Sequence, residues 1–123
     1  MPRKTLYIIC MIALLGFAGS LTFIPNFFWS LFGTTADAHG VWIGRYMTAV
    51  MLGNVYMLWR LMDFEQGAHA AKYFSQAQIV EWGLVGIYVA IYTLQGGYSA
   101  MGWGMAILSL LFAVLFGIDG FKD

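Results

Sequence analysis

Few side chains in this sequence could do chemistry, and most of them interrupt long apolar stretches. Arg45 stands near the start of "GVWIGRYMTAVMLGNVYMLWR", Asn54 follows later in the same stretch, and Glu81 begins another apolar stretch. Within a bilayer an ionisable or amide side chain needs a partner, because the hydrocarbon holds no water to hydrogen-bond it. These three residues are therefore the first candidates for contacts with a ligand or a partner chain.

A polar stripe extends from Glu81. At about 100° per residue, four polar side chains fall within about 40° of one line along a helix: Glu81, Tyr88, Tyr92 and Gln95. Such a stripe should face protein, ligand or water rather than lipid tails. Two interpretations stay open at this point. The tyrosines bond to neighbouring helices, or the stripe lines a pocket for a lipid headgroup or a quinone-like molecule.

No pattern in the sequence predicts catalysis or a metal site. His39 and His69 fall in expected loops, which disfavours haem ligation within the membrane. The single cysteine, Cys10, permits no intramolecular disulfide and no CxxC pair. Nucleophile, Walker and dinucleotide motifs are absent from the sequence, and both Glu81 and Asp119 are expected near the membrane surface. We therefore expect a non-catalytic protein without cofactor or metal, in contact with bound lipids.

The elements that position these residues are predicted to be membrane spans. Of 123 residues, 61% are hydrophobic and 10% charged, whereas soluble domains carry about a quarter charged residues. The charges balance and form no basic cluster, which argues against nucleic-acid binding. Four stretches have the roughly 20 apolar residues of a span: residues 5–24, 41–61, 79–98 and 100–118. We predict an all-α, integral membrane four-helix bundle that forms one domain over residues 1–123.

The basic residues orient this bundle. Apart from Arg45, every Lys and Arg lies before the first span, around the second loop or after the last span. Because cytoplasmic loops carry the excess of Lys and Arg, both termini are expected in the cytoplasm. Arg3 and Lys4 before an apolar run also resemble a signal peptide. We expect this segment to remain as the first span.

The charged residues are expected at different depths in the membrane. Arg45 is expected about 6 Å below the outer end of its span, whereas Glu81 is expected at the inner end of residues 79–98, so we predict no ion pair between them. Near the cytoplasmic surface, Glu81, Arg60, Asp119 and Lys122 are expected to form a network, such as Arg60 with Glu81 or Asp119.

Arg45 and Asn54 need partners on different faces of the second span. For Arg45 the alternatives are lipid phosphate reached by snorkelling, Asp37 or a neighbouring carbonyl, and an anionic or carbonyl-bearing ligand. Asn54 lies nine residues further on, half a turn out of phase. This span is therefore expected to contact its own bundle on one face and another subunit on the other.

Two further sets of residues predict packing and anchoring. Small side chains recur every three or four residues through the last span, a pattern that lets helices approach closely: Gly102, Ala106, Ser109, Ala113 and Gly117. Aromatic side chains gather after Pro25 in a segment too short to cross the membrane, as in an amphipathic segment at the outer interface: Phe27, Phe28, Trp29 and Phe32.

Features of the first two spans carry a family resemblance. Pro25 follows the first span, an aromatic segment ends in "WSLFG" at Gly33, a polar residue stands early in the second span, and a small-residue step joins Ala49 to Gly53. This third of the chain resembles the DoxX-like group of small bacterial four-helix membrane proteins. In that group the early polar residue is usually acidic, whereas here it is Arg45. The resemblance implies a four-helix bundle, and we expect the bacterial inner membrane as its location.

Three functions are considered in order. The first is a non-catalytic accessory subunit of a larger membrane complex, whose partners are the bilayer and other membrane subunits or a second copy of the chain. The alternative is a binding protein or carrier for a lipid- or quinone-like amphipathic ligand, held between the second and third spans. A membrane enzyme of lipid metabolism comes third and would require Glu81 to point into that pocket.

Overall fold

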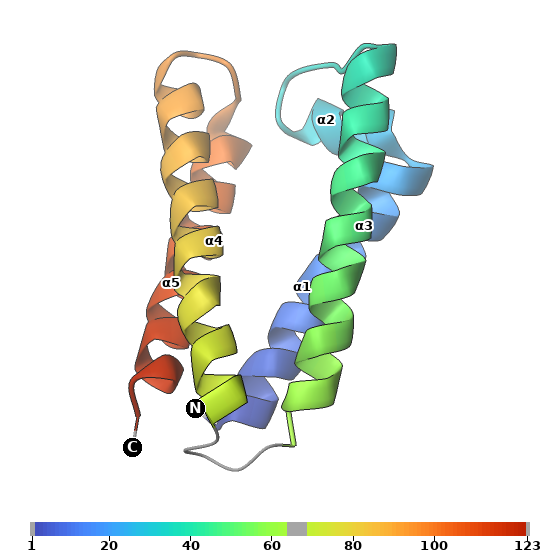
Figure 1. The fold of residues 1–123 in the computed structure, drawn as a ribbon. Coiled ribbons are helices and arrows are strands. Elements are labelled where there is room, and N and C mark those ends of the chain that lie inside the picture. Colours follow the sequence, from blue (N-terminus) through green and yellow to red (C-terminus); the bar gives the residue numbers. More distant parts are fainter. Residues whose placement is uncertain (1, 64–68, 123) are drawn as a thin grey trace.

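A computed structural model describes residues 2–63 and 69–122, and within these ranges the regular structure is entirely helical. The predicted all-α class is therefore confirmed. Helix α1 packs along α3, and α4 packs along α5, so that the chain forms two antiparallel helical hairpins (Figure 1). The five helices are α1 (Arg3–Phe23), α2 (Pro25–Leu31), α3 (Ala38–Leu61), α4 (His69–Leu94) and α5 (Ala100–Gly120).

Three of the helices, α1, α4 and α5, are long and apolar enough to cross a membrane. Large apolar side chains also cover their outer surfaces; Ile107 on α5, for example, is 67% exposed. Such a surface suits lipid rather than water. Helix α3 is not among the three, although it has 24 residues. Arg45 and Asn54 in its apolar stretch lower its mean hydropathy.

The predicted helix ends hold within a few residues except in α4. This helix begins at His69, ten residues before the predicted start at residue 79, and it ends at Leu94 rather than at residue 98. The predicted spans implied a loop over residues 62–78. In the structure, two polar side chains of the extra turns point into the protein, since Ser75 and Gln78 are almost completely buried. Residues 64–68 of the expected loop lie outside the described residues.

Small residues bring α4 and α5 into close contact. A Cβ atom at Gly102 would overlap the hydroxyl group of Thr93 on α4, and one at Gly117 would lie 3.7 Å from Ile79. The contact leaves no room for larger side chains at the first of these positions. The other members of the predicted ridge are buried or half-buried: Ala106, Ser109 and Ala113.

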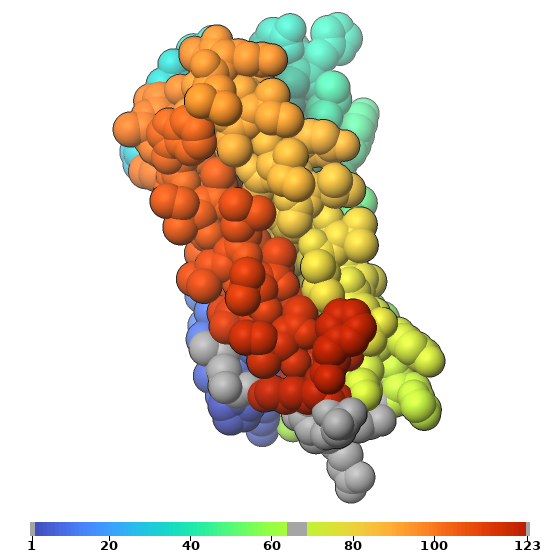
Figure 2. Space-filling model, turned by 90° about the vertical axis from the view of Figure 1, so that its left-hand side faces the viewer, coloured from blue at the N-terminus to red at the C-terminus, as the bar shows by residue number. Residues whose placement is uncertain are grey.

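The two hairpins meet at both ends, and side chains of α1, α3, α4 and α5 form a shared apolar core between them. At one end α1 meets α5 through Arg3 and Asp119. At the other end the backbone N–H of Ser99 donates to the carbonyl of Phe32 at 2.7 Å, which joins the two loops. Figure 2 shows α4 and α5 covering one face, with α1 beside α5 near the lower end. Helices α3 and α4 make few contacts with each other.

Replacing Gly102 by alanine tests the close approach of α4 and α5. The added Cβ meets Thr93 and Tyr98, and we expect Gly102→Ala to lower the free energy of unfolding by about 1–3 kcal/mol, as overpacking does. Gly104→Ala on the same helix is the control, since a Cβ there meets nothing within 4 Å. Thermal unfolding in mild detergent measures both. Equal midpoints for the two variants would contradict the packing described.

Candidate ligand site

A buried polar cluster joins the hairpins at the end where the first and last helices meet. The basal cluster consists of Arg3, Tyr7, Ser75 and Asp119, each no more than 4% exposed. Arg3 Nε lies 2.9 Å from Asp119 Oδ2, which also accepts a hydrogen bond from Ser75 Oγ at 2.6 Å. The hydroxyl groups of Tyr7 and Ser75 lie 2.6 Å apart. One carboxylate oxygen thus ties α1 to both helices of the second hairpin.

The predicted partner for Asp119 was wrong. Arg60 was expected to pair with Glu81 or Asp119, but its guanidinium group lies 5.6 Å from the ring centroid of Trp59 on the exposed side of α3. Arg3 takes that role instead. The sequence signal for this pair was a carboxylate near the other terminus, since both termini were expected on the same side of the membrane.

Glu81 lies in the middle of α4, so the prediction that it stands at the end of its helix was also wrong. Because α4 begins at His69, Glu81 is about 18 Å along the helix axis. Its Oε2 accepts hydrogen bonds from Asn54 Nδ2 at 3.2 Å and from Gln78 Nε2 at 3.0 Å. Trp82 Nε1 donates in turn to Gln78 Oε1 at 3.1 Å. We name these four residues the polar tie; it links α3 to α4 across the gap between the hairpins.

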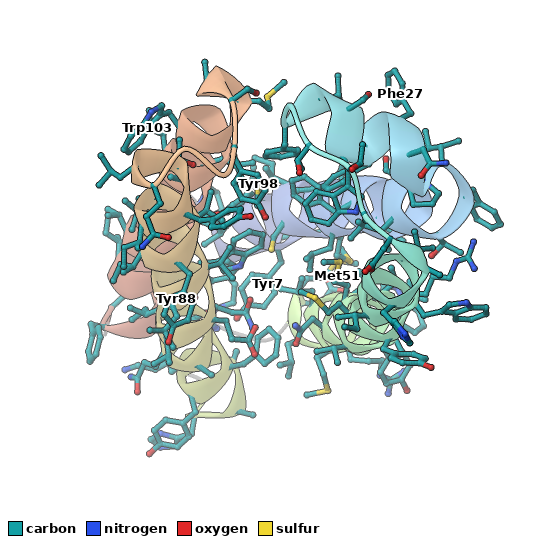
Figure 3. The ribbon with its side chains drawn as sticks, turned by 90° about the horizontal axis from the view of Figure 1, so that it is seen from above. Tyr7, Phe27, Met51, Tyr88, Tyr98 and Trp103 are labelled. Carbon is teal, nitrogen blue, oxygen red and sulfur yellow. The ribbon has the colours of Figure 1, made fainter. Side chains whose placement is uncertain are left out.

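Beside the polar tie lies a lateral cleft of about 530 Å³ between α3 and α4. This volume is within the range of small-molecule sites. Its walls are almost entirely apolar and include Phe17, Met47, Val50, Met51, Val85 and Tyr88. Figure 3 shows Met51 and Tyr98 facing the space between the hairpins from opposite sides. Asn54 and Glu81 are its polar lining, so the cleft offers a hydrocarbon surface with one polar patch.

The polar stripe predicted on the third span divides between two places. Glu81 and Tyr88 line the lateral cleft, where the tyrosine side chain is 64% exposed. Tyr92 lines a second pocket at the end of the molecule. Gln95 follows the end of α4 and is exposed.

Both polar residues of α3 find partners within the chain. Arg45 Nε donates to the carbonyl oxygen of Thr22 at 3.3 Å, and its guanidinium lies 4.7 Å from the ring centroid of Trp42. Of the partners considered for Arg45, the structure shows a neighbouring carbonyl, that of Thr22. Asn54 bonds to Glu81 on the other side. Helix α3 therefore packs against α1 on one face and reaches α4 through the Asn54–Glu81 hydrogen bond across the lateral cleft.

The aromatic segment in α2 turns mostly inward. Phe27 points away from the protein and is 59% exposed (Figure 3). The other three predicted anchors line the lateral cleft: Phe28, Trp29 and Phe32. Trp29 and Phe32 pack there against the ring of Tyr98, whose centroid lies 5.3 Å from that of Phe32, and Phe28 packs against both of them. The sequence pattern showed an amphipathic segment but could not show that a tyrosine from the last loop would cover it.

Within residues 2–63 and 69–122, no three His, Cys, Asp or Glu side chains converge as a metal site would need. Comparison of the chain with protein-family models, curated proteins and solved structures gave no match. The function is therefore inferred from the geometry of the lateral cleft and of the groups around it.

Removing Asp119 tests the basal cluster. Asp119→Ala removes the carboxylate that lies 2.9 Å from the buried Arg3 Nε, and we expect a loss of about 3–5 kcal/mol in unfolding free energy. Asp63→Ala is the matched control, because the ion pair of Asp63 with Lys4, at 3.3 Å, is largely exposed and such pairs contribute little. Thermal midpoints in detergent distinguish them. A similar midpoint for both variants would refute a stabilising role for the cluster.

Proposed function

We propose that this protein binds a lipid- or quinone-like amphipathic molecule in the lateral cleft, without catalysing a reaction on it. The observation that carries the proposal is the cleft itself, with apolar walls from both hairpins and a carboxylate beside them. Its opening between α3 and α4 would face the hydrocarbon of the bilayer. A molecule already dissolved in the membrane could then move sideways into the cleft without passing through water.

The proposed setting is a four-helix bundle in the bacterial inner membrane, with α3 as the fourth span and both termini in the cytoplasm. Aromatic residues support a membrane-crossing α3. Trp42 and Trp59 lie near its two ends, about 26 Å apart along the axis, close to the thickness of the hydrocarbon layer. Each has an arginine over its ring, Arg45 and Arg60 respectively. Tryptophan and arginine are typical anchors at membrane interfaces.

Glu81 indicates which polar group the ligand would carry. Its Oε2 accepts the bonds from Asn54 and Gln78, whereas Oε1 accepts none from the described residues. An acceptor beside an apolar cleft favours a ligand with a hydrogen-bond donor, such as a hydroxyl group. Deep in a membrane this bond has no competition from water, which makes it selective.

Filling the cleft should remove the ligand. We expect Val85→Trp, which places an indole among the cleft walls, to abolish retention of a lipid-like molecule through purification in mild detergent. Ile107→Trp is the control, since Ile107 lies on the outer surface of α5. Mass spectrometry of the washed protein gives the readout. The proposal fails if the wild type retains no such molecule, or if both variants retain it equally.

Neutralising the carboxylate should weaken binding. In Glu81→Gln the amide oxygen can still accept from Asn54, so the polar tie stays while the charge is lost. We expect about tenfold weaker ligand binding, the usual effect of losing one charge-assisted hydrogen bond. Competition between wild type and variant for the retained molecule measures the ratio of their affinities. An unchanged affinity would exclude Glu81 as a ligand contact.

A second candidate function is that of an accessory subunit, favoured by an exposed small-residue step on α3. Ala49 and Gly53 are exposed, and a Cβ at Gly53 would meet nothing within 4 Å. Small residues spaced in this way let a helix of another chain approach closely. A photo-crosslinker at Gly53 that gives one defined protein adduct would support this role. Adducts with lipid alone would oppose it.

A further inference from the structure

A second cavity, the end pocket, lies where the loop before α3 meets the loop between α4 and α5. Its volume is about 480 Å³. Three aromatic side chains line it, Trp29 from α2, Tyr92 from α4 and Tyr98 from the last loop, together with Asp37 and the residues 34–36 before it. None of the residues proposed to hold the ligand's polar group in the lateral cleft takes part. The end pocket shares Trp29 and Tyr98 with the lateral cleft but has its own charged group, Asp37.

The three rings are held in fixed positions relative to one another. The ring centroids of Trp29 and Tyr98 lie 6.1 Å apart with nearly parallel planes, at 18°. The rings of Tyr92 and Tyr98 meet edge to face, with centroids 4.7 Å apart. Gly97 allows this arrangement, because a Cβ there would overlap the Tyr92 ring. The hydrogen bond from Ser99 N–H to Phe32 then fixes the loop against α2.

The charge of the end pocket is negative. Asp37 caps α3, with its Oδ1 accepting from the backbone N–H of Gly40 at 2.7 Å. Asp37 is exposed overall and lines the end pocket. Among the described residues that line the cavity there is no Lys, Arg or His. The Tyr92 side chain is 47% exposed, and an exposed aromatic face attracts cations, so this ring and the carboxylate favour the same kind of ligand.

We propose that the end pocket binds a quaternary ammonium group or a similar small organic cation. Aromatic cages with a nearby carboxylate suit such cations because a methylated ammonium has an apolar surface and a diffuse charge. An anion would be repelled by Asp37, and a divalent metal would find too few oxygen ligands. This inference goes beyond the proposed function, since a free cation can bind there whether or not the lateral cleft holds a molecule.

The cation can come from two sources. It can be a free small molecule, or it can be the headgroup of a lipid whose chains lie in the lateral cleft. The second source is geometrically open because Trp29 and Tyr98 line both cavities.

The test for the site compares choline with its uncharged isostere, 3,3-dimethyl-1-butanol. The full-length protein in dodecyl maltoside is titrated with each, and the indole NMR signal of Trp29 is followed after assignment by Trp29→Phe. We expect choline to bind at least about tenfold more tightly than the isostere. Asp37→Asn should lower the affinity for choline about fivefold. The variant keeps α3 capped, because asparagine caps helices as well as aspartate does.

Asp63→Asn is the control variant, as this exposed carboxylate belongs to the opposite end of the molecule. Choline binding should be unchanged in it. Equal affinity for choline and the isostere, or an equal effect of the two aspartate variants, would overturn the proposal. Neither result would depend on the lateral cleft, so Val85→Trp should bind choline normally even where it loses the retained molecule.

Nanodiscs distinguish the two sources. Retention of phosphatidylcholine over phosphatidylglycerol by the wild type, and its loss in Asp37→Asn, would show that the cation is a lipid headgroup. Choline binding without such retention would show a site for a free cation and exclude the headgroup. Failure of both choline and phosphatidylcholine to bind would refute the site altogether.

Discussion

The ion pair between Arg3 and Asp119 is the interaction on which the arrangement of the two hairpins depends. Both side chains are almost completely buried, and Ser75 and Tyr7 extend the pair into the second hairpin. In a membrane, apolar side chains gain little by leaving lipid for one another, so polar contacts and close packing decide which helices associate. The buried charge pair therefore acts together with the apolar core around Tyr7 and Phe116 to hold the hairpins together, and the lateral cleft lies beyond that core.

The side-chain packing within the second hairpin is therefore closer than the packing between the two hairpins. Within the second hairpin, Gly102 and the small residues that follow it bring α4 and α5 together. Between the hairpins the facing residues are large, such as Phe17, Met51 and Tyr88, and they line a cleft instead of a tight contact. The polar tie through Asn54 and Glu81 crosses this space at a single level. The hairpins thus stay connected while a volume suited to a hydrocarbon chain stays open beside the tie.

Much of the fold was predictable from the sequence because it depends on local patterns. Long apolar stretches predicted the helices, and Pro25 marked the start of α2. The beginning of α4 was missed because its first turns are polar on the side that faces protein, and average hydropathy cannot separate such turns from a loop. That error placed Glu81 at a membrane surface and hid its bond to Asn54. The pairing of Arg3 with Asp119 and the covering of Trp29 by Tyr98 join residues far apart in the chain, and no local pattern carries such information.

The central claim, that the lateral cleft holds a selected molecule, is tested most directly by photo-crosslinking in native membranes. A benzoylphenylalanine in place of Tyr88, which lines the cleft and is 64% exposed, would reach the cleft without filling it, and one at position 107 would face bulk lipid. The account predicts a dominant adduct of one molecular class at position 88 and the composition of the whole membrane at position 107. The same lipid mixture at both positions would contradict it.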